Sequence, residues 1–229
     1  MNKVRLVIFD IDGTIIEDHG EVVASFSSAL AANGLPASEP EIKELKGSSK
    51  RDVIRKFVER KWGKEDAGND DRIRKAYGDF RTELENRFSN GGVKPILGAE
   101  SSFAWLKAHD IVCATTTGFY RSVTDRILDS AGWRQMFAAN ICSDDVQVGR
   151  PSPYMIFHAM EASRIDNVRQ VLNVGDTPLD IQAGTRAGVL GVIGVLSGVH
   201  KEVRLSQESP SYLIPSVADI PSLIEAHYS

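Results

Sequence analysis

Two aspartates separated by one residue follow the first apolar segment, in the stretch Val7-Ile8-Phe9-Asp10-Ile11-Asp12-Gly13-Thr14. The apolar residues 6–9 predict a buried strand. If the chain turns after Asp10, both carboxylates converge on one pocket, where they repel each other unless a cation lies with them. Mg²⁺ suits such a pocket, because it takes oxygen ligands and keeps waters that a phosphate can replace. An Asp-Gly turn that simply ends a strand is the alternative for this motif alone.

Further polar groups occur where later strands are expected to end or a loop enters a helix. They are Thr115–Gly118, Gly149-Arg150-Pro151, and Asp176 with Asp180. Each has a plainer interpretation: a β-forming residue for Thr116, a solvated charge for Arg150, and a helix N-cap for Asp176. Because the carboxyl ends of parallel strands border one crevice, all four groups in this order predict a shared active site.

The hydrophobic periodicity predicts the elements that position these groups. From Ile15 to about Gly92 it is helical, and from Pro95 onward strands and helices alternate. We therefore predict an α/β fold with a doubly wound, Rossmann-like parallel sheet, built from residues 1–15 and 94–229. Residues 16–93 are predicted to form an inserted four-helix-bundle cap domain. Its boundary loops are expected near residues 15–19 and 89–94.

The individual elements follow from the same pattern. In the insert, Asn33-Gly34 is expected to close the first helix, Ser38 and Ser49 to cap the next two, and residues 69–88 to form the fourth. Later helices are expected at 101–109, 121–130, 151–162, 180–188 and 219–227, and strands at 111–116, 137–143, 171–174, 189–195 and 212–217. Pro151 is expected to begin its helix, and Pro215 indicates an edge strand.

The composition excludes several classes of function. The 229 residues, 42% hydrophobic, are enough for a sizeable core, and the net charge of -4 with a pI near 5.8 gives no electrostatic footprint for nucleic acid. There is no apolar run of membrane-spanning length. A first strand from Val4 leaves no room for a signal peptide. Cys113 and Cys142 both lie in apolar runs, so we predict that they are small buried residues with free thiols, as is usual in the reducing cytosol. We expect a cytoplasmic protein without nucleic-acid or membrane partners, and its oligomeric state stays open.

The ordered motifs resemble those of the haloacid dehalogenase-like hydrolase superfamily over nearly the whole chain. Asp10-Ile11-Asp12-Gly13-Thr14 is similar to the first motif, Thr116-Thr117-Gly118 to the second, and Gly175-Asp176 with Asp180 to the fourth. Arg150 stands where that family usually has a lysine, so a bidentate fork replaces a point charge. The helical insert between the first two motifs is similar to the superfamily's first cap type.

This resemblance implies Mg²⁺-dependent hydrolysis of a small phosphomonoester through an aspartyl-phosphate. Asp10 is the implied nucleophile, and Asp12 the implied general acid and then base. Thr116 and Arg150 are implied to stabilise the charge of the phosphoryl group. The implied metal ligands are Asp10, the main-chain carbonyl of Asp12, Asp176 and, in support, Asp180. The implied contacts to phosphate come from Thr14, Thr117, Gly118 and Lys50.

Within the superfamily, the chain is most similar to the phosphonoacetaldehyde hydrolase-like branch, through residues 116–121 and 149–155. True members of that branch use a cap lysine that forms a Schiff base, and Lys50 in Gly47-Ser48-Ser49-Lys50 resembles it in position. A first-turn surface lysine or a phosphate-attracting cap residue is the plainer interpretation of Lys50. Asp12 favours a phosphatase, because those C–P hydrolases carry a small residue there and need no acid.

Two alternatives to the phosphatase therefore remain. One is phosphonoacetaldehyde hydrolase-like cleavage of a C–P bond with Lys50 as Schiff base. The other is a non-catalytic phosphate-binding sensor, which requires a broken site, and none of the four motifs is broken. Beyond the fifth strand, His200 and the nearby Ser197-Gly198 are interpreted as a plain loop or as the edge of the pocket.

Overall fold

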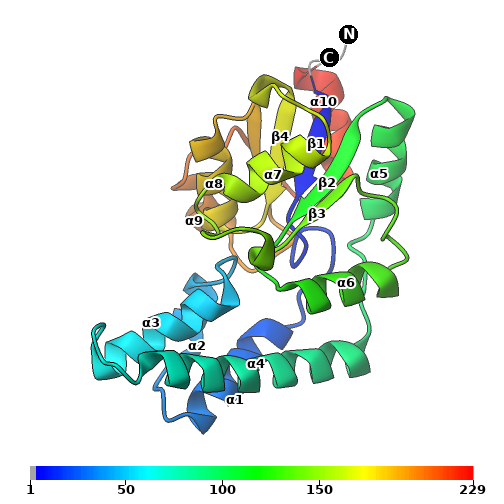
Figure 1. Ribbon diagram of the computed structural model, residues 1–229. Helices are drawn as coiled ribbons and strands as arrows, with labels where there is room; N and C mark the ends of the chain where they lie inside the picture. Colours follow the sequence, from blue (N-terminus) through cyan, green and yellow to red (C-terminus); the bar gives the residue numbers. More distant parts are fainter. Residues whose placement is uncertain (1–3, 229) are drawn as a thin grey trace. The chain divides into compact units, whose positions relative to one another are not determined.

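The computed structural model describes residues 4–228, and the chain divides into two compact units. An α/β unit contains the segments that end at Asp18 and begin at Val93, and a helical unit contains His19–Gly92 (Figure 1). The sequence-based boundaries at 15/16 and 93/94, and the role of the insert as a cap, stay predictions.

Within the described α/β unit, six strands form one parallel sheet in the order β3-β2-β1-β4-β5-β6. The strands are β1 (Leu6–Phe9), β2 (Val112–Thr116), β3 (Ala139–Ile141), β4 (Val171–Gly175), β5 (Gly191–Val195) and β6 (Tyr212–Ile214). The chain extends the sheet to one side of β1 and then returns to the other side for β4. This topology confirms the predicted doubly wound sheet, and its switch point lies between β1 and β4.

The central strand β1 is apolar throughout because helices cover both faces of the sheet. Leu6 and Ile8 pack in the cluster that includes residues of α7 (Tyr154–Ala162) and α8 (Pro178–Ala187). Phe9 points to the other face, where its ring meets Phe103 of α5 (Ala99–Ala108) at 5.4 Å. Helix α10 (Ile220–His227) packs against α5 on this second face (Figure 1).

The helical unit has four α-helices among its described residues: α1 (Glu21–Ala32), α2 (Glu39–Glu44), α3 (Lys50–Trp62) and α4 (Asn69–Gly91). The long helices α1 and α4 pack through stacked rings of Phe26 and Phe80, whose centroids are 4.2 Å apart. Ser38 caps α2 in a capping box with Glu41, as predicted. Ser49 precedes α3, but its side chain makes no capping hydrogen bond.

Several predicted boundaries are wrong. The helix expected from Pro151 begins at Tyr154, because residues 149–152 form a turn in which the Ser152 amide donates to the Gly149 carbonyl at 3.0 Å. The strand expected over 137–143 has only three residues, Ala139–Ile141. Helix α4 continues to Gly91, where a loop was expected, and the side chains of residues 90 and 91 lie outside the description.

Helices α6 (Arg121–Ser130) and α9 (Glu202–Ser206) complete the described α-helices. The bounds of α6 match the prediction, whereas α9 was not predicted, since five residues carry too little periodicity. None of the helices in residues 4–228 combines the length and the apolar character needed to cross a membrane.

Replacing Phe103 by alanine tests the aromatic cluster behind the site. Phe103 is buried and meets Phe9, Trp133 and Phe137 edge-on, with centroids 5.1–5.4 Å apart. Phe103→Ala should lower the free energy of unfolding by about 3–5 kcal/mol, as measured by urea denaturation. Ser101→Ala, on the exposed face of the same helix, should change it by less than about 0.5 kcal/mol. Equal stabilities of the two variants would contradict this description of the core.

Candidate active site

The strand register brings three polar residues to the carboxyl edge of the sheet. Phe9 pairs with Thr115 on one side and Val174 on the other, and the Asp10 amide donates to the Val174 carbonyl at 2.9 Å. Asp10, Thr116 and Asp176 therefore follow or end neighbouring strands at the switch point. This is the edge at which open α/β sheets bind ligands.

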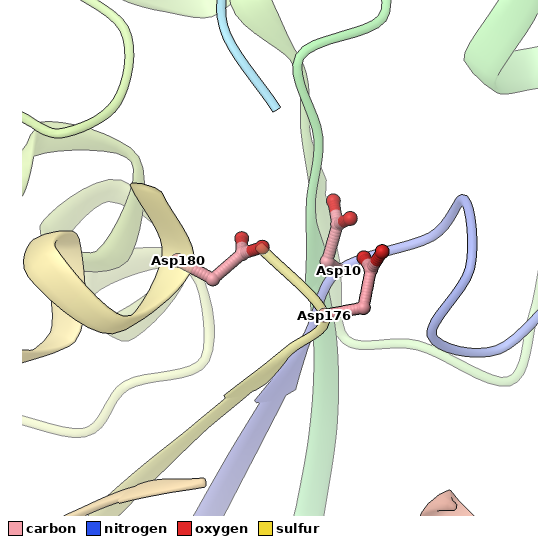
Figure 2. Close-up of side chains that lie close together, drawn as sticks. All are labelled: Asp10, Asp176 and Asp180. Carbon is pink, nitrogen blue, oxygen red and sulfur yellow. The ribbon is translucent and has the colours of Figure 1, made fainter. Parts of the chain in front are cut away.

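Three buried carboxylates gather at this edge. Each of Asp10, Asp176 and Asp180 offers an oxygen, and these oxygens lie within 4.8 Å of one another. Figure 2 shows Asp10 following β1, Asp176 following β4, and Asp180 on the first turn of α8, with their carboxylates converging. Burial raises the pKa of Asp10, the Arg150 guanidinium lowers it, and the Asp180 carboxylate raises it, with a net rise. Such a cluster requires a nearby cation.

Arg150 supplies one cation through a fully buried guanidinium. Its Nη1 lies 2.8 Å from an Asp10 oxygen and 2.6 Å from an Asp180 oxygen. Its Nη2 donates to the Thr116 carbonyl at 2.8 Å and to the Thr116 hydroxyl oxygen at 2.7 Å. The interpretation of Arg150 as a surface charge is therefore wrong, since its side chain is 3% exposed. The fork joins the ends of β1 and β2 to the first turn of α8, a set of contacts that a single ammonium is too compact to make.

The charges of the cluster fit a divalent cation. Among the described residues of the α/β unit, the cluster contains three carboxyl groups, and Arg150 pairs with two of them, so that ionised carboxylates outnumber the guanidinium. Carboxylate oxygens are the ligands that hard cations such as Mg²⁺ prefer. The donor set therefore suits Mg²⁺ both in chemistry and in charge.

Two loops hold the Asp176 side chain, each through a different carboxylate oxygen. The Thr14 hydroxyl donates to one Asp176 oxygen at 3.2 Å, and the Val199 amide donates to the other at 3.1 Å. A Cβ atom on Gly198 would lie 1.9 Å from an Asp176 oxygen, and one on Gly13, where φ is +83°, would lie 2.7 Å away. Both positions thus require glycine for close approach of the backbone. Gly198 and Val199 therefore border the site, which agrees with the interpretation of Ser197-Gly198 as the edge of the pocket rather than as a plain loop.

Asp180 has both carboxylate oxygens engaged. One faces Arg150, and the other accepts from the Thr177 amide at 3.0 Å and the Thr177 hydroxyl at 2.5 Å. Thr177 in turn accepts from the Asp180 amide, so that the two residues form a capping box at the start of α8. The N-cap is therefore Thr177, and the alternative interpretation of Asp176 as N-cap is wrong. Asp180 thus supports the cluster while it fixes Arg150.

The other predicted residues of the α/β unit are buried, and two of them use their hydroxyl groups in contacts within the protein. Asp12 is buried, and its carboxylate is not part of the cluster of three. The Thr14 hydroxyl is used on Asp176, and the Thr117 hydroxyl accepts from the Phe119 amide at 3.2 Å within its own loop. Gly118 is buried beside them. Their predicted contacts to phosphate stay predictions.

Lys50 is the one predicted residue that belongs to the helical unit. It is the first residue of α3 and is 4% exposed, so the interpretation as a surface lysine is wrong. The two cysteines take no part in the site. Both are buried, and burial raises the pKa of Cys113 and of Cys142 to about 12, so that neither forms a thiolate near neutral pH.

Comparison with known sequences confirms the predicted resemblance. A family model described as haloacid dehalogenase-like hydrolase matches residues 7–195. A phosphonoacetaldehyde hydrolase from Latilactobacillus sakei subsp. sakei is 35% identical over 204 residues, which cover 84% of this chain and 76% of that protein. A phosphoglycolate phosphatase from Agrobacterium fabrum is 28% identical over 223 residues, which cover 96% of this chain and 92% of that protein.

Comparison with solved structures confirms the fold. A hydrolase from Pseudomonas syringae superposes with a TM-score of 0.86 at 20% identity, covering 98% of this chain and 100% of that one. A phosphonoacetaldehyde hydrolase like protein from Oleispira antarctica superposes with a TM-score of 0.85 at 23% identity, covering 98% and 92%. At such identities the likeness concerns the arrangement of the sheet and its helical insert.

Replacing Gly198 by alanine tests whether Asp176 depends on the loop after β5. The added Cβ overlaps the Asp176 carboxylate, which must then turn away from the cluster. Gly198→Ala should weaken Mg²⁺ binding about 10- to 100-fold, the usual effect of losing a group that orients a metal ligand. Calorimetric titration with Mg²⁺ measures this. Gly78→Ala, where the added Cβ meets open space in α4, is the control, and equal affinities of the two variants would contradict the assignment.

Proposed function

The chain belongs to the haloacid dehalogenase-like hydrolases, and from that premise we propose that it is a Mg²⁺-dependent hydrolase of a small phosphomonoester. The observation that carries the proposal is the separation of the two aspartates of the first motif. Asp10 lies in the carboxylate cluster and contacts Arg150, whereas the carboxylate of Asp12 lies outside the cluster. One is thus suited to attack phosphorus, and the other to carry a proton.

In the first step, an Asp10 oxygen attacks phosphorus and forms an aspartyl-phosphate, while the bond from phosphorus to the ester oxygen breaks. Asp12 donates its proton to the departing oxygen, which leaves as an alcohol. Arg150 holds the Asp10 carboxylate by one oxygen, so that the attacking oxygen is oriented before substrate arrives.

In the second step, Asp12 takes a proton from water, and the water oxygen attacks phosphorus to release phosphate and regenerate Asp10. Thr116 assists both steps. Because its hydroxyl oxygen accepts from Arg150, its own O–H is directed away from the guanidinium and toward a phosphoryl oxygen. Arg150 therefore contributes by ordering Asp10 and Thr116 together.

The proposed metal site comprises Asp10, Asp176 and the main-chain carbonyl of Asp12, with Asp180 in support. When bound, Mg²⁺ neutralises the repulsion between the anionic nucleophile and the anionic phosphate. Thr14 and Val199 keep Asp176 oriented for this role. The helical unit acts as a cap that closes over a small phosphorylated metabolite, with Lys50 attracting its phosphate.

Phosphonoacetaldehyde hydrolysis is the second candidate. Its support is the phosphonoacetaldehyde hydrolase that is 35% identical, together with the burial of Lys50. A Schiff base requires a lysine amine that attacks the carbonyl carbon of the substrate, and Lys50 resembles the lysine that does so in true members of that branch. Asp12 argues against this candidate, because a carbanion stabilised by a protonated imine needs no acid at the leaving atom.

The nucleophile and the metal are tested together. Asp10→Asn should reduce turnover of phosphomonoesters to background with the fold intact, because an amide oxygen is too weak a nucleophile to form the phosphoenzyme. Asp166→Asn, an exposed position, should keep full activity. Chelation should remove wild-type activity, and added Mg²⁺ should restore it. Substantial activity of Asp10→Asn, or full activity in excess chelator, would overturn the proposal.

Asp12 and Lys50 separate the two candidates. Asp12→Ala should lower phosphomonoester turnover by about 10²–10⁴-fold, the usual contribution of general acid–base catalysis. Lys50→Arg, which keeps the charge but forms no imine, should retain kcat, and Lys50→Ala should act mainly on KM. Lys56→Ala, exposed on the same helix, is the control.

Borohydride reduction in the presence of phosphonoacetaldehyde provides a readout independent of rate. We expect no covalent adduct by mass spectrometry. A reduced adduct on Lys50, together with activity on phosphonoacetaldehyde that survives Asp12→Ala, would replace the phosphatase by the second candidate.

A further inference from the structure

The loop after β2 contains one buried backbone amide, that of Gly118, for which the described residues provide no acceptor. The Thr117 amide donates to the Ile141 carbonyl at 2.9 Å, and the Phe119 amide donates to the Thr117 hydroxyl at 3.2 Å. Between them, the buried Gly118 amide has no acceptor among the described residues. Thr116, two residues earlier at the end of β2, shares the Arg150 guanidinium with Asp10.

A second loop, after β3, fixes the first one. The Ser143 amide and the Ser143 hydroxyl both donate to the Phe119 carbonyl, at 2.9 and 2.8 Å. Phe119 is thus held through its carbonyl and its amide, and Thr117 through its amide. The peptide that carries the Gly118 N–H therefore lies between two anchored residues.

The start of α6 is attached to the same second loop. The Tyr120 side chain makes no capping hydrogen bond, and an Asp144 oxygen instead accepts from the Arg121 amide at 2.9 Å. The Arg121 guanidinium donates to the Asn140 carbonyl at 3.0 Å and pairs with Asp145. Asp145 also accepts from the Cys142 amide at 2.8 Å, so that the loop after β3 is joined both to the end of β3 and to the start of α6. We call the three residues Ser143, Asp144 and Arg121 the clamp.

We infer that Ser143, Asp144 and Arg121 are positioning residues that hold the Gly118 amide for a phosphoryl group, while Arg150 holds the Thr116 hydroxyl for the same group. This inference rests on the proposed function. The Arg121 side chain is 38% exposed and paired with carboxylates, so its effect passes through the loop rather than through substrate. Hydrogen-bond donors that are already oriented before the reaction need no reorganisation as negative charge develops on the phosphoryl group. Residues that fix this orientation therefore favour the reaction without contacting the substrate.

The residue types fit this task. A carboxylate at a helix N-terminus satisfies a free amide and interacts favourably with the helix dipole, which suits Asp144. The planar fork of arginine reaches a carbonyl and a carboxylate at once, which suits Arg121. Serine offers an amide and a hydroxyl to one carbonyl, which suits Ser143.

The test measures binding of inorganic phosphate in the presence of Mg²⁺, by calorimetry and as competitive inhibition of p-nitrophenyl phosphate hydrolysis. Ser143→Ala and Asp144→Ala should each weaken phosphate binding about 3- to 10-fold, the size of one net hydrogen bond. Mg²⁺ binding without phosphate should stay unchanged, because the contacts to Asp176 are not altered. Asp144→Asn keeps an acceptor for the Arg121 amide and should restore phosphate binding to within about twofold of the wild type.

Asp129→Ala is the matched control, because Asp129 is an exposed aspartate near the other end of α6 and pairs with Arg134. It should leave phosphate binding unchanged. If Ser143→Ala and Asp144→Ala bind phosphate as the wild type does, even with a lowered melting temperature, the clamp only supports the fold and the inference is overturned. A wild-type protein that binds phosphate but hydrolyses no phosphomonoester would instead overturn the proposed function and leave the clamp standing.

Discussion

The buried negative charge at the carboxyl end of β1 is the constraint on which the rest of the structure depends. Three carboxylates removed from water carry a large desolvation cost, and one guanidinium offsets only part of it. The shortage of positive charge is consistent with a metal site, and in the proposed reaction a divalent cation bound there would attract an anionic substrate. The hydrogen bonds around the three carboxylates hold them and Arg150 in one geometry.

Close approach of the backbone provides much of that geometry. Asp176 receives hydrogen bonds from the loops after β1 and β5, and both loops come near enough that a Cβ on Gly13 or Gly198 would overlap it. The Ser197 hydroxyl joins these two loops by donating to the Gly13 carbonyl at 2.9 Å. The end of β1 therefore contributes twice, by carrying Asp10 and by restraining Asp176 through Thr14.

The sequence predicts the parts of this structure that depend on local pattern. The four apolar residues of β1 and the periodicity of α6 set their elements without ambiguity, and the ordered motifs identify Asp10, Thr116, Arg150 and Asp176 as neighbours. Long-range contacts were not predictable. For Ser197-Gly198 the sequence leaves a plain loop and the edge of the pocket open, and nothing local distinguishes Ser143 and Asp144 from an ordinary polar turn. The partners of these residues lie 22 or more residues away. The start of α7 was misplaced because the turn at 149–152, which precedes it, has no periodic signature.

The division of the chain into two units explains why the reaction class is easier to derive than the substrate. Every group proposed to make or break a bond to phosphorus lies in the α/β unit, where the sheet register fixes it against its neighbours. Lys50, the residue proposed to distinguish the two candidate reactions, lies in the helical unit. Cleavage of the C–P bond requires an electron sink at the carbonyl carbon of the substrate, such as an imine. Cleavage of a P–O bond is instead helped by a proton delivered to the leaving oxygen. Asp12, which also lies in the α/β unit, is the residue proposed to supply that proton, and this is the reason for proposing phosphate esters as the substrates.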